Sequence, residues 1–283
     1  SDNQQGQHAY VELENTSTSG EYNCLKMTNR GRVRVDNIYL KATSKRGEAF
    51  LGCGTNQLEF LTAWADLQSG LSGKRGVSNF ITCTIGKGSY LKEGEFDSSK
   101  KTFVNGSTEL SRVQINPELT VGGVIVDTSN SLISIYPRGK TAGIIYWREG
   151  KLVFDNVAGS LGNANLPSPY GKSLVYNSKV EQLKISVAGN NNLKALSGVS
   201  DTYGIYSVWE VSLEGATTNY ADNKLTYRGD NGIDAEYDKL SIANVTLDIK
   251  GESPISCPND KLTITKSKIV AEDTRNSGDA EAK

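Results

Sequence analysis

"GIDAEYDKLSIANVTLDIKGESPISCPNDKLTITKSKIVAED", residues 232–273, contains the same pattern twice. Aligning the stretch with itself places Ile233 over Ile255 and Leu240 over Leu262, a period of 22 residues. Each copy has a leading isoleucine, a polar turn and a Leu-x-Ile group, and its apolar residues alternate with polar ones as in strands that bury one face. The stretch therefore predicts two stacked repeats built from strands.

Related units occur upstream in the chain. Their leading and inner apolar residues are Ile205, Val211 and Leu213; Val175, Leu183 and Ile185; Ile145, Leu152 and Phe154; and Leu51, Leu58 and Phe60. Periods of this size are typical of solenoids, in which one repeat cannot cover its own apolar side chains and stacking closes the interior. We expect an all-β solenoid of roughly ten irregular coils, about 50 Å long at ~4.8 Å per coil.

Three segments carry a resemblance to a known superfamily: "LTITKSKIVAED" (262–273), "LSIANVTLDIKG" (240–251) and "VRVDNIYLKAT" (33–43). They resemble the rungs of right-handed parallel β-helix proteins, which include pectate-lyase-like folds and many exported surface proteins of bacteria. The resemblance is clearest over residues 144–273 and implies a right-handed parallel β-helix. An immunoglobulin-like or fimbrillin-like sandwich, which also has alternating strands at regular spacing, is the alternative.

The chain is expected to form one domain. Residues 1–21 are predicted to be a polar leader or N-terminal cap, residues 22–273 the β-helix, and residues 274–283 a disordered tail. The segment "QLEFLTAWADLQ" (57–68) is the one candidate helix. The first residue is Ser1, so we expect an exported protein at the cell surface, outside the cell or on the periplasmic side, with a lipid tether upstream of Ser1 as an option.

Composition argues against several partner classes. The chain has 31 Lys and Arg against 32 Asp and Glu, a net charge of -1, with the two signs interleaved. A nucleic-acid-binding surface usually shows clustered basic residues, so nucleic acid is not an expected partner. No apolar run approaches the ~18 residues of a membrane-spanning helix, so no transmembrane segment is expected.

The four cysteines leave two interpretations open. Cys24, Cys53, Cys83 and Cys257 contain no C-x-x-C pair and no histidine accompanies them, so no metal site is expected. They fit free thiols in the core, since cysteine behaves as a small buried apolar residue. Disulfides are the alternative in an exported protein, with Cys53 and Cys83 as the neighbouring pair.

A candidate ligand-binding strip consists of aromatic residues at equal spacing. Tyr146, Tyr176 and Tyr206 are 30 residues apart and each follows the leading apolar residue of a unit, so all three should point outward; Trp209 and Tyr170 lie near them in sequence. Stacked outward rings could lie against sugar rings or against the apolar surface of a partner. The alternative is a ladder of rings that only stabilises the sheet.

Catalytic candidates are few. His8 is the only histidine and lies in the polar leader, which excludes Ser-His-Asp and Cys-His catalysis. No residue is assigned as catalytic and no cofactor is expected. Polysaccharide-cleaving β-helices use carboxylates, and an acidic cluster near Arg228 contains Asp230, Asp234, Glu236 and Asp238. The same residues also fit an ordinary turn and a solvated strand face.

These observations favour an exported cell-surface binding or adhesion protein with a glycan or polysaccharide as ligand and no evident catalytic machinery. Two alternatives stay open. One is a polysaccharide lyase or glycoside hydrolase that uses Asp and Glu residues on one face of the β-helix. The other is a structural spacer that binds no ligand.

Overall fold

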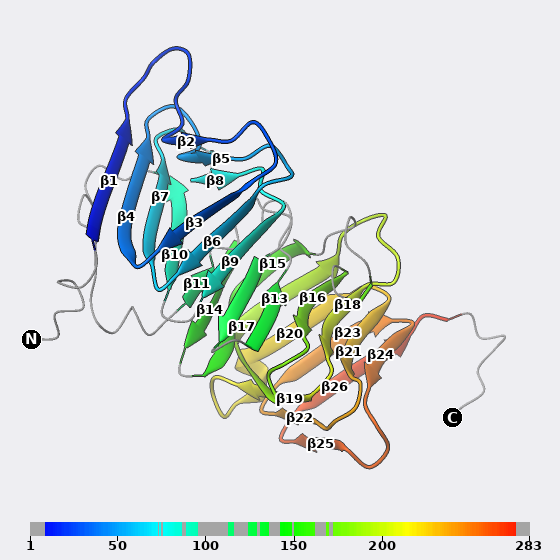
Figure 1. Ribbon diagram of the computed structural model, residues 1–283. Helices are drawn as coiled ribbons and strands as arrows, with labels where there is room; N and C mark the ends of the chain where they lie inside the picture. Colours follow the sequence, from blue (N-terminus) through cyan, green and yellow to red (C-terminus); the bar gives the residue numbers. More distant parts are fainter. Residues whose placement is uncertain are drawn as a thin grey trace, which may run out of the picture.

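A computed structural model describes residues 9–72, 74, 76–86, 89–95, 113–115, 124–128, 131–135, 142–148, 150–161, 168–169 and 172–275. The structure is elongated and all-β, with the blue N-terminal strands at one end and the orange and red C-terminal strands at the other (Figure 1). Within the described ranges, the only helical segment is the 3-10 turn η1 (Tyr220–Asp222), and no helix is long and apolar enough to span a membrane.

The N-terminal third repeats a group of three strands. The groups are β2 (Leu25–Lys26), β3 (Arg32–Asp36) and β4 (Ile38–Ser44); β5 (Phe50–Leu51), β6 (Gln57–Leu61) and β7 (Trp64–Ser69); and β8 (Val77–Ser78), β9 (Thr82–Gly86) and β10 (Tyr90–Glu95). Each strand pairs in parallel with its counterpart in the next group. Leu58, for example, lies in register between Val33 and Cys83.

The C-terminal third repeats the same arrangement. Its groups are β18 (Tyr203–Ser207), β19 (Glu210–Gly215) and β20 (Asn223–Arg228); β21 (Asn231–Ala235), β22 (Leu240–Ala243) and β23 (Thr246–Gly251); and β24 (Ser253–Ser256), β25 (Leu262–Thr265) and β26 (Lys268–Asp273). Ile233 lies in register between Ile205 and Ile255, and Leu240 pairs with Leu262. The duplication seen in residues 232–273 is therefore confirmed as two stacked groups of parallel strands.

The middle of the chain departs from uninterrupted parallel stacking. It contains β11 (Val113–Ile115), β12 (Val124–Thr128), β13 (Ser131–Ile135), β14 (Ala142–Arg148), β15 (Lys151–Leu161), β16 (Ser173–Asn177) and β17 (Gln182–Ala195). The pairs β11/β14, β14/β15, β12/β13 and β13/β16 are antiparallel. Two residues join β14 to β15, and a connection that short permits only a hairpin. The unit predicted around Ile145 is thus wrong, because Ile145 pairs with Phe154 of the same unit.

Four sheets enclose one apolar core. The described strands form a nine-stranded sheet (β24-β21-β18-β16-β13-β12-β9-β6-β3), a ten-stranded sheet from β11 through β14, β15 and β17 to the C-terminal strands, the sheet β1-β4-β7-β10, and the sheet β2-β5-β8. The nine-stranded sheet runs through all three regions of the chain. Its inward residues join a single core cluster that extends from Val35 to Ile249.

Residues 57–68 form strands, so the candidate helix is wrong. Leu58 and Phe60 are fully buried on β6, and Leu67 is fully buried on β7. This period of two is the pattern of strands that bury one face. Thr62 separates the two strands with a left-handed backbone (φ 50°), and Asn37 marks the same corner in the preceding group (φ 55°). The corner, not a helical turn, brings both strands onto the core.

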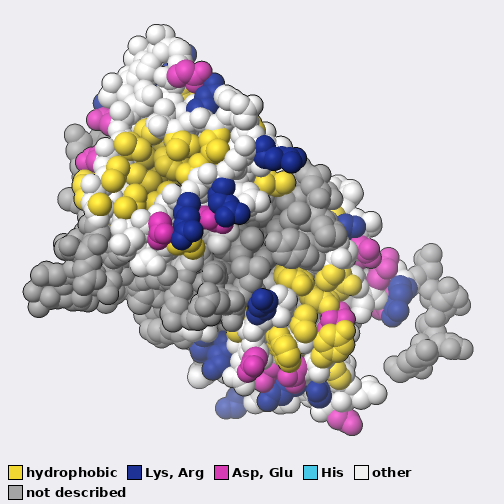
Figure 2. Space-filling view, viewed as in Figure 1, with side chains coloured by type: hydrophobic (Ala, Val, Ile, Leu, Met, Phe, Trp, Pro, Cys, Tyr) yellow, Lys and Arg dark blue, Asp and Glu magenta, His cyan; other side chains and the backbone are white. Residues whose placement is uncertain are grey.

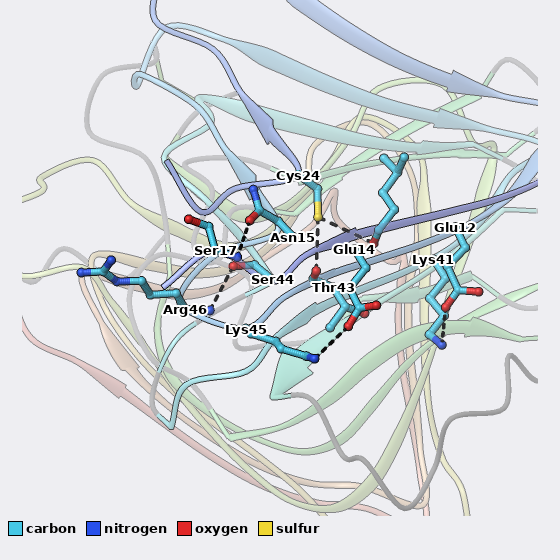
Figure 3. A network of polar contacts seen from close by, with 11 residues as sticks. Glu12, Glu14, Asn15, Ser17, Cys24, Lys41, Thr43, Ser44, Lys45 and Arg46 are labelled. Atoms are coloured by element: carbon cyan, nitrogen blue, oxygen red, sulfur yellow. Dashed lines mark hydrogen bonds and ion pairs between the residues drawn. The ribbon is translucent and has the colours of Figure 1, made fainter. Parts of the chain in front are cut away.

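The segment assigned as a polar leader contains a strand. β1 (Ala9–Asn15) pairs in parallel with β4 over its whole length. Ion pairs hold it there, with Lys41 Nζ 2.9 Å from Glu12 Oε1 and Lys45 Nζ 3.2 Å from Glu14 Oε1 (Figure 3). Residues 1–8 and 276–283, most of the predicted tail, lie outside the described residues.

Cys24, Cys53, Cys83 and Cys257 all lie in the described part of the chain, and no disulfide joins them. Cys83 is fully buried on β9 and belongs to the core cluster. Cys53 lies in the turn after β5, where its N–H donates to Asn56 Oδ1 at 2.8 Å. Cys53 and Cys83 therefore do not lie at equivalent positions of adjacent strands. The expectation that they are neighbours was wrong.

Candidate functional site

Two of the predicted tyrosines stack on the outer face of the nine-stranded sheet. β16 and β18 are parallel neighbours, and Tyr176 lies opposite Tyr206 in their register. The two ring centroids are 5.7 Å apart and the ring planes differ by 3°. Tyr203, at the start of β18, contacts Tyr206 edge-on with centroids 5.3 Å apart. The sequence spacing of 30 residues thus corresponds here to one step between adjacent strands.

The remaining members of the aromatic strip lie elsewhere. Tyr146 is on β14 of the ten-stranded sheet, opposite Val153, and so does not continue the file of Tyr176 and Tyr206. The cause is the antiparallel hairpin β14/β15, which places this unit in another sheet. Tyr170 lies outside the described residues.

Trp209 lies in the turn after β18. Its indole Nε1 donates to Ser178 O at 3.1 Å, and 38% of the residue surface is exposed. The indole is therefore anchored to the neighbouring turn after β16 while part of it faces solvent.

The stacked tyrosines do not present the flat strip of ring faces that the sequence suggested. With planes only 3° apart, Tyr176 and Tyr206 turn their faces toward one another. Tyr206 is buried and Tyr176 is half-buried, so most of the aromatic surface that this pair leaves exposed belongs to Tyr176. Stacked pairs also stabilise adjacent strands, so the ring ladder contributes to the sheet as well.

Two carboxylates continue the same surface. Asp234 on β21 lies opposite Tyr206, and Ser256 on β24 lies opposite Asp234. The hydroxyl of Tyr206 donates a hydrogen bond to Glu236 Oε2. The aromatic and acidic groups that the sequence suggested as separate alternatives are thus brought together. We call Tyr176, Tyr203, Tyr206, Asp234 and Glu236 the tyrosine–carboxylate patch; Figure 2 shows hydrophobic and acidic side chains together over β16, β18 and β21.

Burial changes the acidity of this patch. Loss of hydration raises the pKa of the Asp234 carboxyl, a hydrogen bond with Ser256 opposes the change, and the charge of Glu236 adds to it. Burial likewise raises the pKa of the Tyr206 hydroxyl, and the hydrogen bond to Glu236 raises it further. The patch therefore holds a carboxyl that is protonated more readily than usual beside a phenol that keeps its proton.

The other acidic residues of the predicted cluster serve turns. The carboxylate of Asp230 accepts a hydrogen bond from Thr202 N–H at 3.1 Å. Asp238 accepts one from Lys239 N–H at 2.8 Å and lies 3.7 Å from Lys261 Nζ. Arg228, expected beside the cluster, pairs with Asp248 at 2.8 Å.

Sequence reasoning missed a second aromatic file. Tyr10, Tyr39, Trp64 and Tyr90 lie in register on β1, β4, β7 and β10. Their separations of 29, 25 and 26 residues follow from their sequence positions and were a usable signal. Tyr39 and Trp64 are buried at 2% and 3% exposure yet lie outside the core cluster. Tyr39 and Trp64 are therefore part of the packing of the N-terminal third, whereas Tyr10 on the edge strand β1 is exposed.

No cation site accompanies these groups. The described residues contain no group of three or more His, Cys, Asp or Glu side chains placed to hold a metal ion. The groups that the patch does offer are hydroxyls, carboxylates and aromatic carbon.

Comparison with known proteins gave no match: no family model, no curated protein and no solved structure is similar to this chain.

Proposed function

We propose that the chain is a right-handed parallel β-helix of the pectate-lyase-like type that works as an exported cell-surface binding or adhesion protein. Its ligand is a glycan, held at the tyrosine–carboxylate patch. Groups of three strands paired in parallel with the next group, at both ends of the chain, support the β-helix. The resemblance of segments 33–43, 240–251 and 262–273 to β-helix rungs supports the class.

The main observation in favour of a glycan ligand is the hydrogen bond of Tyr206 with Glu236 beside the ring of Tyr176. A sugar presents hydroxyl groups that donate to carboxylates and C–H faces that pack on aromatic carbon. The patch offers both kinds of partner within one surface of three adjacent strands, β16, β18 and β21. A rigid sheet holds these groups in place, which reduces the entropy lost on binding.

A glycan array tests this proposal. The Tyr206→Phe variant keeps the stacked ring and removes only the hydroxyl, and Glu236→Gln removes the charge that accepts from it. We expect both variants to lose at least about tenfold in affinity for any glycan that the wild-type protein binds, equivalent to ~1.4 kcal/mol. Tyr220→Phe, in the exposed turn η1, is the matched control and should bind as the wild type does. Equal binding by all four proteins would exclude the patch as the site.

A second candidate is a glycoside hydrolase or polysaccharide lyase that acts through the same carboxylates. The observation in its favour is the raised pKa of Asp234 beside Glu236, because acid and base roles require two carboxyl groups in different environments. New reducing ends or unsaturated products from a polysaccharide panel, lost in Asp234→Asn and Glu236→Gln, would favour this enzyme. Binding without product would favour the binding protein, and neither signal would favour a structural spacer.

A further inference from the structure

The C-terminal end of the stack leaves core positions uncovered. Leu240 and Ile242 on β22 are 0% and 1% exposed, whereas their register partners Leu262 and Ile264 on β25 are 44% and 46% exposed. In the described part of the chain, β24, β25 and β26 each pair with a strand on one side only (Figure 1). Uncovered apolar side chains beside unpaired strand edges are a surface that favours association.

The residues that follow Arg275 in the given sequence are mostly polar. Residues 276–283 read NSGDAEAK and contain two alanines as their only apolar side chains. They contain neither the leucine nor the isoleucine that covers each preceding group.

The edge strand β26 is complementary to itself. We propose that a second copy of this chain covers the C-terminal end, with β26 of the two copies paired antiparallel about a two-fold axis at Val270. This register sets Lys268 opposite the partner's Glu272, Ile269 opposite the partner's Ala271, and Val270 opposite itself. Opposite charges directly across an antiparallel pair are stabilising, and a two-fold axis forms the contact twice.

The backbone of β26 fits this register. Lys268 N–H donates to Val245 O at 3.0 Å and Thr274 N–H donates to Gly251 O at 2.9 Å, both toward the stack. Because successive residues of a strand alternate, Ile269 and Ala271 direct their N–H and C=O groups to the free edge. These two residues would form the hydrogen-bonded pair with the partner.

Side-chain faces also select this register. Ile269 packs against the core cluster, so alternation places Lys268, Val270 and Glu272 on the outer face. If the two-fold axis passed between two residues of β26, each core-facing residue would lie opposite an outward-facing residue of the partner. An axis at Ala271 would set Ile269 against the partner's Asp273. The axis at Val270 keeps apolar with apolar and cation with anion.

Lys268 and Glu272 can each form the ion pair across the proposed contact. Within the described residues Lys268 makes no ion pair, while Glu272 Oε1 accepts from Lys250 Nζ at 2.6 Å. Glu272 has a second carboxylate oxygen with which to accept from the partner's Lys268. The contact does not depend on the tyrosine–carboxylate patch, so it can fail or hold without changing the proposed function.

A charge exchange tests the contact. Sedimentation equilibrium of the full chain should give twice the 30.6 kDa chain mass for the wild type. Lys268→Glu and Glu272→Lys should each weaken the dimer at least tenfold, and the double variant should restore it. Lys184→Glu, an exposed change on β17, is the control and should leave the dimer intact. Circular dichroism melts show that each variant is folded.

Three results would overturn the proposal. A monomeric wild type would remove the dimer, and a double variant as weak as the single variants would remove the Lys268–Glu272 pairing. Open-ended assembly that grows with concentration would assign the surface to the opposite end of another copy, because a head-to-tail contact does not close.

Discussion

Ile242 and Ile264 are register partners on adjacent parallel strands, yet the exposed fraction is 1% for Ile242 and 46% for Ile264. The two residues have the same side chain and the same position in the repeat. The difference arises because Ile242 has a further strand, β25, on its C-terminal side, and the described chain gives Ile264 no such neighbour. Each group of strands is therefore covered by its neighbours, as expected for a repeat whose stability is a sum over adjacent units.

Truncation of these two isoleucines should have different costs. Ile242→Ala removes fully buried methyl groups and should lower the free energy of unfolding by about 2–5 kcal/mol. Ile264→Ala removes half-exposed groups and should cost less than half as much. Urea unfolding of the two variants, at a concentration at which the chain is monomeric, measures both values, and equal losses would contradict nearest-neighbour burial.

Gly232 is predicted to tolerate no side chain. A Cβ there would lie 2.1 Å from Pro254 O and 2.5 Å from a methyl group of Ile249. Gly232→Ala should therefore destabilise the protein by at least about 1–3 kcal/mol, the usual cost of overpacking. Gly31→Ala is the control, because its Cβ would meet only the flexible end of Met27 at 3.0 Å. A Gly232→Ala variant that melts with the wild type would show that β21 and β24 are not so closely paired.

The corner between β22 and β23 requires a left-handed backbone. Asn244 occupies it with φ 57°. Glycine adopts this conformation freely and a β-branched residue does not. Asn244→Val should cost about 1–2 kcal/mol, and Asn244→Gly should remain within about 1 kcal/mol of the wild type. Thermal unfolding compares the two; if valine were as stable as glycine, the corner would have another geometry.

Asp234 should make stability depend on pH. Its pKa is raised in the folded state, so folding disfavours the charged carboxylate. The resulting penalty is absent below the unfolded pKa of about 3.9 and appears as pH rises through the higher folded value. Asp234→Asn should therefore raise the melting temperature at pH 7 and change it little near pH 3. Asp260→Asn, on an exposed turn, is the control. A variant that stabilises equally at both pH values would contradict titration as the cause.

The fold could be predicted from sequence where strands are short, alternating and parallel. The match of Ile233 with Ile255 came directly from the period-2 pattern and the repeated turn. The hairpin of β14 and β15 could not be distinguished in this way, because Ile145 has the same apolar pattern as a parallel unit. The usable signal was local: only two sequence positions separate Arg148 from Lys151, too few for a parallel crossover.

The candidate site was predictable only in part. The spacing of Tyr176 and Tyr206 indicated their contact correctly, since each occupies the same place in consecutive parallel strands. Equal spacing failed for Tyr146 because its strand joins a different sheet. The contact between Tyr206 and Glu236 could not be predicted from the sequence. The register partner of Tyr206 is Asp234, and Glu236 lies in the turn after β21.

Deletion of one whole group of strands tests the stacked parallel repeat most directly. Removing residues 231–252 joins Asp230 to Ser253, which lies in register with Asn231. The strands β24, β25 and β26 can then take the places of β21, β22 and β23. Removing residues 216–237 is a control of equal length that breaks the order of the three strands. The measurement is thermal unfolding followed by far-UV circular dichroism. The stacked repeat predicts one cooperative β-sheet transition for the first deletion and none for the second. An unfolded first deletion, or two deletions that behave alike, would contradict it.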